Sequence, residues 1–293
     1  MIRKLLLLFS LVLCFGCSKS APASPKIEKP LVLVSIAPYQ FLVEAIAGST
    51  VEVQTVVPSS ANPHSYEPTS SQVSSMLRAG TWFRIGEPFE EKILPIFLRR
   101  NPDLKVLDLR IGIELLEEGH MDCHHCSMDH FDRHIWLSPK LASLQAGEIA
   151  RVLSEQFPDK KEFFTQNLKE LQTKLIQLDA EIFALLAEVK DRVILVSHPA
   201  FGYFCRDYHF EQLSVEYEGK DPRPKHLEQI LKKAAFHRAE IALALPQYNN
   251  KGAQLIAEKL HLPVHFIDPY SPDYFINMRK LAHLIANPTI HRE

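Results

Sequence analysis

The segment KKEFFTQNLKELQTKLIQLDAEIFALLAEVK, residues 160–190, decides how the rest of the chain is organised. Between residues 164 and 189 its apolar side chains recur at alternating steps of four and three, with charged residues between them. That spacing places them on one face of a helix. Residues 159–193 contain no Gly or Pro. The pattern therefore predicts one helix of about 30 residues, roughly 45 Å long.

This helix could pair with a second copy or connect two parts of one chain. The repeat is a fair heptad, which on its own fits a dimerising coiled coil. Further apolar residues widen the face beyond a two-position seam: Phe163, Ile176, Phe183 and Leu186. We therefore predict a connecting helix over residues 158–190 that packs along the lobes on either side of it.

Short β-branched runs alternate with longer helical patterns on both sides of the predicted helix. Before it they cover residues 31–36, 51–57, 81–86 and 105–109. After it they cover residues 193–197, 214–218, 241–245 and 264–268. Such alternation is typical of parallel sheets covered by helices. We predict an α/β fold of two lobes, residues 31–157 and 191–293, each with a parallel β-sheet flanked by helices.

The composition excludes several classes of protein. A hydrophobic share of 46% with 23% charged residues excludes intrinsic disorder. The 33 Lys and Arg nearly balance the 35 Asp and Glu, so the chain lacks the basic excess that binding to a phosphate backbone requires. We expect no nucleic-acid partner. The 14 His residues are the unusual feature of the composition.

The N-terminus has the pattern of an export signal. Two basic residues precede an apolar run at residues 5–15, which is too short to span a bilayer, so we assign residues 1–16 as a signal peptide. Gly16 and Cys17 before a polar tether at residues 17–30 resemble a lipoprotein cleavage site. We favour lipidation of Cys17 over a simple secretory signal. The mature protein is then expected in the periplasm or on the outer face of the cytoplasmic membrane, attached to the membrane only through that lipid.

Residues 114–134, ELLEEGHMDCHHCSMDHFDRH, concentrate metal-binding side chains. The spacing CHHC is too compressed for a structural zinc site, which needs two separated pairs of ligands. We favour a weak metal-gathering loop over residues 114–133, called the His-rich loop below. A loop closed by a disulfide and a high-affinity site are the alternatives. The candidate donors of the loop are His120, His124, His125, His130, Cys123 and Cys126.

Four other donors lie at better positions in the predicted fold. They are His64 in NPHSYEPT, His134 in HIWLSP, His198 in SHPAFGYF and Asp268 in VHFID. In open parallel sheets, ligands bind beyond the carboxyl ends of strands, where three of these four residues are expected. Two donors from each lobe would place a metal between the lobes. Three imidazoles and one carboxylate would saturate a tetrahedral zinc ion, which favours binding over catalysis because no position is left for a reactive water.

At these residues the chain resembles the metal-binding solute receptors of bacterial ABC importers, which take up zinc, manganese or iron. The motifs NPHSYEPT, GEPFE, HIWLSP and HPAFGYF stand in the family's order and spacing. The resemblance implies two α/β lobes joined by one long helix, an ABC permease and its ATPase as partners, and a short version of the His-rich loop of zinc-specific members. It also implies four metal ligands: His64, His134, His198 and Asp268. Asp273 is the nearest competing carboxylate.

The predicted function is a non-enzymatic receptor that captures Zn²⁺ between the lobes and delivers it to the permease. The same receptor for Mn²⁺ or Fe²⁺ is the main alternative, although a His at position 198 in place of an acid favours zinc. A surface adhesin, a zinc buffer or a secreted zinc hydrolase is less favoured, the last because HExxH and GxSxG are missing. We expect a monomer, and we consider Glu67 as a side chain that orients an imidazole.

Overall fold

The computed structural model describes residues 29–117, 131–190, 192–216 and 222–288. The predicted signal peptide, Cys17 and nearly all of the tether lie outside these ranges. So do the candidate donors of the His-rich loop: His120, His124, His125, His130, Cys123 and Cys126. Within the described part of the chain, no helix combines the length and the apolar character that crossing a membrane requires.

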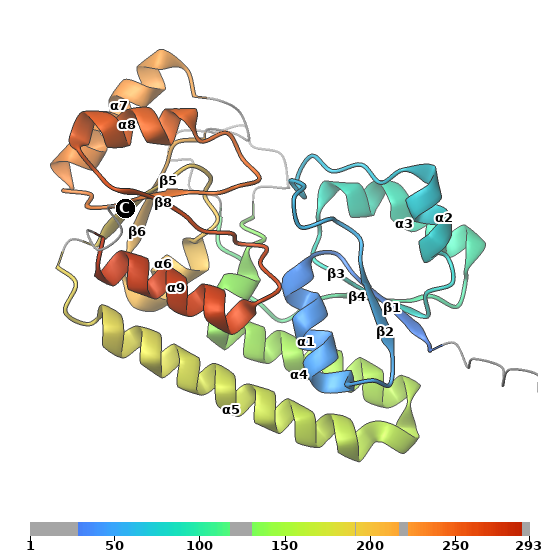
Figure 1. Cartoon of the computed structure of the whole chain (residues 1–293). Coiled ribbons are helices and arrows are strands. Elements are labelled where there is room, and N and C mark those ends of the chain that lie inside the picture. The colour runs from blue at the N-terminus through green and yellow to red at the C-terminus, as the bar shows by residue number, and fades with distance from the viewer. Residues whose placement is uncertain (1–28, 118–130, 191, 217–221, 289–293) are drawn as a thin grey trace, which may run out of the picture.

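The first lobe is built on a parallel four-stranded sheet with the order β2-β1-β3-β4 (Figure 1). Its strands are β1 (Leu31–Val34), β2 (Glu52–Thr55), β3 (Thr81–Arg84) and β4 (Lys105–Asp108). They alternate with the helices α1 (Ala37–Ala47), α2 (Ser70–Met76) and α3 (Pro88–Arg100). The central strand β1 is an apolar run that is buried throughout, as expected for a parallel strand covered on both faces.

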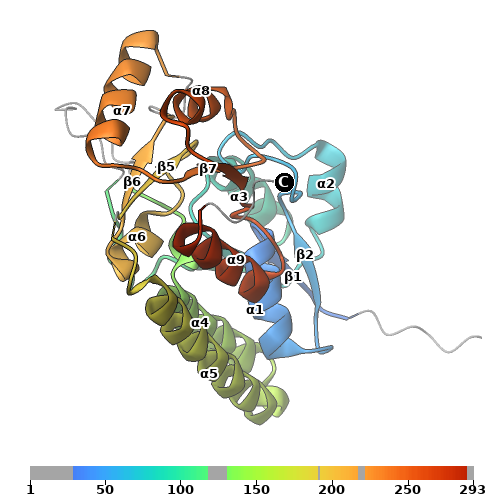
Figure 2. The ribbon, with the colours of Figure 1, turned by 60° about the vertical axis from the view of Figure 1, so that its left-hand side comes forward.

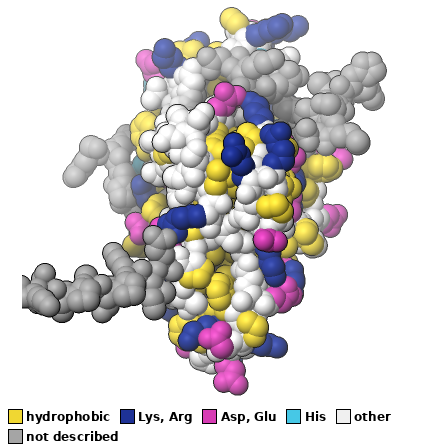
Figure 3. All heavy atoms as spheres, turned by 90° about the vertical axis from the view of Figure 1, so that its right-hand side faces the viewer, with side chains coloured by type: hydrophobic (Ala, Val, Ile, Leu, Met, Phe, Trp, Pro, Cys, Tyr) yellow, Lys and Arg dark blue, Asp and Glu magenta, His cyan; other side chains and the backbone are white. Residues whose placement is uncertain are grey.

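The surface of this side of the molecule is mixed in character. Figure 3 shows Lys and Arg side chains interspersed with Asp, Glu and hydrophobic side chains on the face that lies to the right in Figure 1. Two of the exposed apolar residues of α3 are Ile96 and Leu98. Scattered apolar residues of this kind are normal on a protein surface and define no binding site.

The second lobe repeats the arrangement of the first, with the order β6-β5-β7-β8. Its strands are β5 (Val193–Val196), β6 (Glu211–Ser214), β7 (Ala242–Ala244) and β8 (Val264–Phe266), all parallel. The helices are α6 (Gly202–Tyr208), α7 (Pro224–Phe236), α8 (Lys251–Leu260) and α9 (Tyr274–Ala286). The predicted α/β fold with two parallel sheets is confirmed.

One predicted strand was wrong. We predicted a strand over residues 214–218, but β6 covers Glu211–Ser214, and Val215 and Glu216 lie beyond its end; residues 217 and 218 lie outside the described residues. The cause is the end of α6, where His209 adopts a left-handed conformation with φ of 61° and turns the chain straight into the sheet. Val215 and Glu216 therefore follow the carboxyl end of the strand, where Glu216 contacts His198.

A pair of helices forms the base on which both lobes rest. They are α4 (Pro139–Gln156), which follows the short 3-10 helix η1 (Ile135–Leu137), and α5 (Lys161–Leu186), which follows the 3-10 turn η2 (Pro158–Lys160). Figures 1 and 2 both show α4 and α5 side by side beneath the sheets. Helix α5 packs on α1 of the first lobe and on α9 of the second. It is therefore the predicted long helix that joins the lobes.

The buried face of α5 explains the apolar repeat. The buried residues of the helix are Phe164, Leu171, Leu175, Leu178, Ile182 and Leu186. They join the main hydrophobic core, so the repeat serves packing within one chain. We predicted that four further residues would widen this packed face. Three of them do not, because Phe163, Ile176 and Phe183 are 47%, 67% and 55% exposed.

Removing a side chain from the buried face should destabilise the whole molecule. Leu178 is 0% exposed, and Leu178→Ala is expected to lower the free energy of unfolding by about 2–5 kcal/mol because it leaves a cavity. Ile176→Ala, on the exposed side of the same helix, should change it by less than about 0.5 kcal/mol. Urea unfolding of the two variants measures the difference. If both variants lost the same free energy of unfolding, α5 would have to pack with a different face.

Candidate metal centre

The structure brings the three predicted histidines together where the two lobes face each other. His64 lies in the loop after β2, and His134 lies immediately before η1. His198 is the second residue after the end of β5. Each offers a ring nitrogen, and these atoms all lie within 4.8 Å of one another. The Nε2 atoms of His64 and His198 are 3.2 Å apart. Among the described residues, these three form the group that could hold a metal ion.

Local turns set the position of each histidine. The His64 backbone N–H donates to Asn62 Oδ1 at 2.9 Å, which is a turn that Asn favours. The His134 backbone N–H donates to Asp132 Oδ1 at 2.8 Å in the same way. His198 follows the buried apolar strand β5, so its backbone is fixed by the sheet. All three are thus held in place by backbone structure, independent of any bound ion.

A carboxylate contacts the outer nitrogen of every ring. The three Nδ1–carboxylate distances are all 2.8 Å, in the pairs His64–Glu87, His134–Asp132 and His198–Glu216. An ionised carboxylate only accepts hydrogen bonds, so each Nδ1 carries a proton and donates it. This fixes the tautomer in which Nε2 is unprotonated and carries the lone pair that can bind a metal. Three lone pairs then converge on one point, an arrangement that a cation stabilises.

Burial keeps the imidazole of His198 neutral. His134 and His198 are 1% and 4% exposed. Burial, together with the neighbouring His134 and His64, lowers the pKa of His198 well below its usual value of 6.5. Burial alone would raise the pKa of Glu87, but its interactions with His64, including the hydrogen bond to the ring, outweigh that effect and lower the pKa. The shifts at His198 and Glu87 favour a neutral nitrogen donor and an ionised carboxylate, which are the forms that support metal binding.

A buried network fixes the turn that carries Glu87. The N–H groups of Ile85 and Gly86 donate to the Glu90 carboxylate at 3.0 and 2.7 Å. Gly86 has φ of 82°, a conformation that favours glycine. Ser35 Oγ also donates to Glu90, whose burial raises its pKa to about 7. The motif GEPFE thus holds Glu87 against His64 from inside the first lobe.

Two tyrosines cover the remaining side of the centre. The ring of Tyr248 stacks on His198 with centroids 3.8 Å apart and an angle of 11° between the planes. Its hydroxyl lies 2.7 Å from the hydroxyl of Tyr270, which in turn lies 3.4 Å from His134 Nε2. Burial and the adjacent Tyr248 raise the pKa of Tyr270 well above 10, so this phenol keeps its proton.

Two of the carboxylates considered from the sequence have other contacts in this structure. Asp268 is not part of the histidine group, and its Oδ1 accepts hydrogen bonds from the Tyr270 N–H at 2.8 Å and from Gln247 Nε2 at 2.9 Å. Glu67 has a 71% exposed side chain and pairs with Lys92 on the surface. The carboxylates that do contact imidazoles were missed in the sequence. Asp132 and Glu87 could have been suspected, since one lies two residues before a ligand and the other inside a quoted motif.

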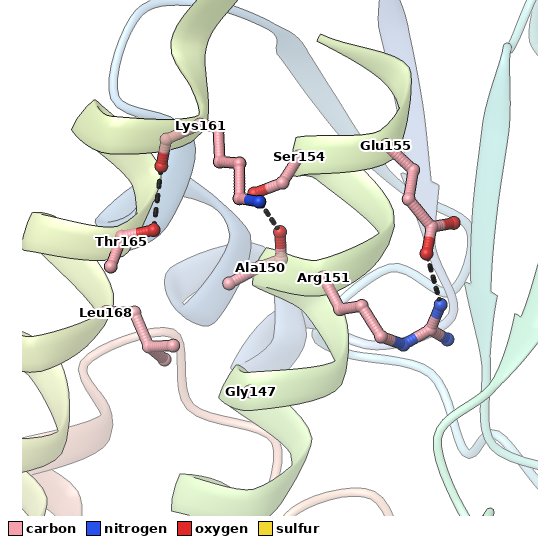
Figure 4. A pocket seen from close by; sticks show the side chains of 8 residues that line it. All are labelled: Gly147, Ala150, Arg151, Ser154, Glu155, Lys161, Thr165 and Leu168. Atoms are coloured by element: carbon pink, nitrogen blue, oxygen red, sulfur yellow. Dashed lines mark hydrogen bonds and ion pairs between the residues drawn. The ribbon is translucent and has the colours of Figure 1, made fainter. Parts of the chain in front are cut away.

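A groove on the described part of the surface lies away from this centre. This groove of about 360 Å³ lies between α4 and α5, and none of the residues that line it belongs to the histidine cluster (Figure 4). Its polar side chains already have partners. Arg151 donates to Glu155 at 2.8 Å, and the Thr165 hydroxyl donates to the Lys161 carbonyl oxygen. It is therefore no competing candidate site.

Fold and site together define a class of protein. Two α/β lobes stand on a common helical base, and imidazoles from both sides of the junction converge with their lone pairs directed at one point. This is a solute-binding protein whose solute is a metal ion.

Comparison with known proteins identifies the family. The family model of ZnuA, described as "Zinc-uptake complex component A periplasmic", matches residues 32–287, so the chain belongs to this family. A protein of Chlamydia trachomatis is 32% identical over 283 residues, which is 96% of this chain and 98% of the relative. The high-affinity zinc uptake system protein ZnuA of Haemophilus ducreyi is 29% identical over 81% of this chain and 84% of its own. A crystal structure of ZnuA aligns with a TM-score of 0.82 at 32% identity, over 89% of this chain and 99% of that one.

Proposed function

We propose that this protein is the receptor that captures Zn²⁺ between its lobes and delivers it to an ABC permease and its ATPase. The observation that carries the proposal is the convergence of three imidazoles whose outer nitrogens are all tied to carboxylates. The zinc-uptake names of the family and of its relatives support it. The ligands are then His64, His134 and His198.

Nitrogen donors favour zinc over the alternative cargoes. Imidazole suits zinc, whereas Mn²⁺ prefers sites rich in carboxylate oxygens. In this centre the carboxylates contact Nδ1 on the outer side of each ring, away from the Nε2 atoms that would hold the metal. They orient ligands there and are not placed to activate a metal-bound water. This supports a receptor and argues against a zinc hydrolase.

We also propose that the mature protein is exported by residues 1–16, anchored by a lipid on Cys17 and monomeric. The sequence pattern of the N-terminus supports the first two statements. The intramolecular packing of the buried face of α5 supports the third, because it uses the surface that a coiled coil would need. The donors of the His-rich loop would gather zinc weakly outside the main centre.

The proposal is tested by calorimetric titration of the mature protein with Zn²⁺, read together with ⁶⁵Zn uptake by cells that carry or lack its gene. We expect tight binding and a loss of uptake at low external zinc in the deletion strain. The proposal would be refuted if the protein did not bind Zn²⁺ tightly, or if its affinity for Mn²⁺ were well above its affinity for Zn²⁺. Chelator competition isolates the main centre from weaker sites in the His-rich loop.

Zinc affinity is expected to fall in acid. Protons compete with zinc for the imidazole lone pairs. Because the pKa of His198 is lowered well below 6.5, this ligand stays neutral at pH 6.5 and above, and its protonation weakens binding only at lower pH. Chelator competition between pH 5 and 8 measures the curve. Equal affinity at pH 5 and pH 7.5 would contradict imidazole ligation.

A further inference from the structure

The two described ends of the His-rich loop come together in a short antiparallel pair, called the loop stem below. They are residues 114–117 and 131–133, which an antiparallel bridge joins. The Asp132 N–H donates to the Leu116 carbonyl oxygen at 2.8 Å. In a hydrogen-bonded antiparallel pair, the two opposite residues exchange two such bonds. The second bond of this pair would run from the Leu116 N–H to the Asp132 carbonyl oxygen.

A tyrosine of the second lobe occupies the place of that second bond. The Tyr203 hydroxyl accepts a hydrogen bond from the Leu116 N–H at 3.0 Å and donates one to the Asp132 carbonyl oxygen at 2.8 Å. Burial raises the pKa of Tyr203 to about 12, so the hydroxyl keeps the proton that it donates. The phenol therefore bridges both sides of the loop stem, and it comes from α6 and not from the lobe that contains the stem.

A small separate core surrounds the ring of Tyr203. The residue is 0% exposed and clusters with Ile135 and Leu141 from the start of the helical base. Leu115 and Leu116 of the loop stem pack against this cluster. These apolar contacts hold the ring without the help of its hydroxyl, so removal of the hydroxyl alone should leave the ring in place.

Asp132 connects the loop stem to the metal centre. Its Oδ1 accepts a hydrogen bond from the His134 N–H and contacts His134 Nδ1, both at 2.8 Å. Its Oδ2 lies against Gly202, and a Cβ at position 202 would clash with this oxygen. The second lobe thus contacts the backbone of Asp132 through Tyr203 and its side chain through Gly202.

We propose that Tyr203 is a positioning residue supplied by the second lobe, which holds Asp132 in place through the loop stem and thereby orients the His134 ring. The orientation of this imidazole then depends on the position of the second lobe, although His134 itself stands at the start of the helical base. The inference deepens the proposed function, on which its zinc readout rests, whereas its structural readouts need no metal.

Tyr203→Phe tests the proposal because it removes the hydroxyl and keeps the buried ring. In the metal-free protein, amide hydrogen exchange at Leu116 should become about 10-fold faster, as expected for the loss of one hydrogen bond. The ¹⁵N signals of the His134 imidazole report its tautomer, and they should shift away from the form protonated on Nδ1. Zinc affinity should fall by about 3- to 10-fold, less than for a direct partner of a ligand.

Tyr208→Phe is the matched control. Tyr208 is also buried on α6, and its hydroxyl donates to Asp179 at 2.9 Å, away from the loop stem. It should leave all three readouts unchanged. Gly202→Ala is a second variant, which keeps the Tyr203 hydroxyl while its added Cβ displaces the Asp132 carboxylate. It should shift the same His134 signals.

Three results would overturn the inference. They are unchanged exchange at Leu116 or unchanged zinc affinity in Tyr203→Phe, unchanged His134 signals in either Tyr203→Phe or Gly202→Ala, and equal changes in Tyr208→Phe. If the wild-type protein failed to bind zinc, the proposed function would be refuted, while the amide exchange and the ring signals would still decide the role of Tyr203.

Discussion

Replacing His198 with Ala is expected to weaken zinc binding by more than about 100-fold. The residue is buried, neutral and contributed by the second lobe, so its loss removes one of three nitrogen donors and the contact of the metal with that lobe. Replacing a residue that hydrogen-bonds to a metal ligand already lowers metal affinity by about 10- to 100-fold, and loss of a ligand itself should lower it more. Competition with a chelator of known affinity measures the change.

His237→Ala provides the control for this substitution. His237 is exposed at the end of α7, so the same change in side chain should leave zinc affinity unaltered. Thermal melting of both metal-free variants checks that they remain folded. Similar zinc affinities for the two variants would remove His198 from the binding site.

Neutralising the partner of His64 should have the second large effect. Glu87→Gln removes the buried charge that orients the His64 ring and fixes its tautomer, and a loss of zinc affinity of about 10- to 100-fold is expected. Glu67→Gln is the matched control, since Glu67 pairs with Lys92 on the surface and should leave zinc affinity unchanged. If the control loses affinity and Glu87→Gln does not, the roles assigned to these two glutamates are reversed.

The fold was largely predictable because its signals are local and strong. Apolar runs such as 31–34 and 193–196 are buried parallel strands, and the Gly- and Pro-free segment around α5 is one helix. The failures came from surfaces that only the tertiary structure defines. Apolar side chains at positions 163, 176 and 183 looked like core, yet they point away from it. Helical spacing shows on which side of the helix a residue lies. It does not show whether another part of the protein packs against that side.

The site was predictable only in part. The three histidines stand in recognisable motifs, and the structure brings them together. The carboxylates that contact these histidines are harder to predict from the sequence. Glu216 was placed inside a predicted strand, and the true strand ends at Ser214, which frees Glu216 to reach His198. Glu87 contacts His64 across 23 residues of sequence, and the motif that contains Glu87 does not indicate which residue it contacts.

The arrangement also suggests why the ligands are divided between the lobes. His64 and His134 are set by the first lobe and the start of the helical base, whereas His198 is set by the second lobe. A bound cation therefore links the lobes, and the common base formed by α4 and α5 limits how far they can move apart.

The most direct measurement is an anomalous difference map at the zinc absorption edge, from crystals of the mature protein grown with Zn²⁺. The account predicts one strong peak within about 2.0–2.1 Å of the Nε2 atoms of His64, His134 and His198 together. A zinc ion bound by fewer than two of these nitrogens, or a main peak elsewhere on the molecule, would contradict it.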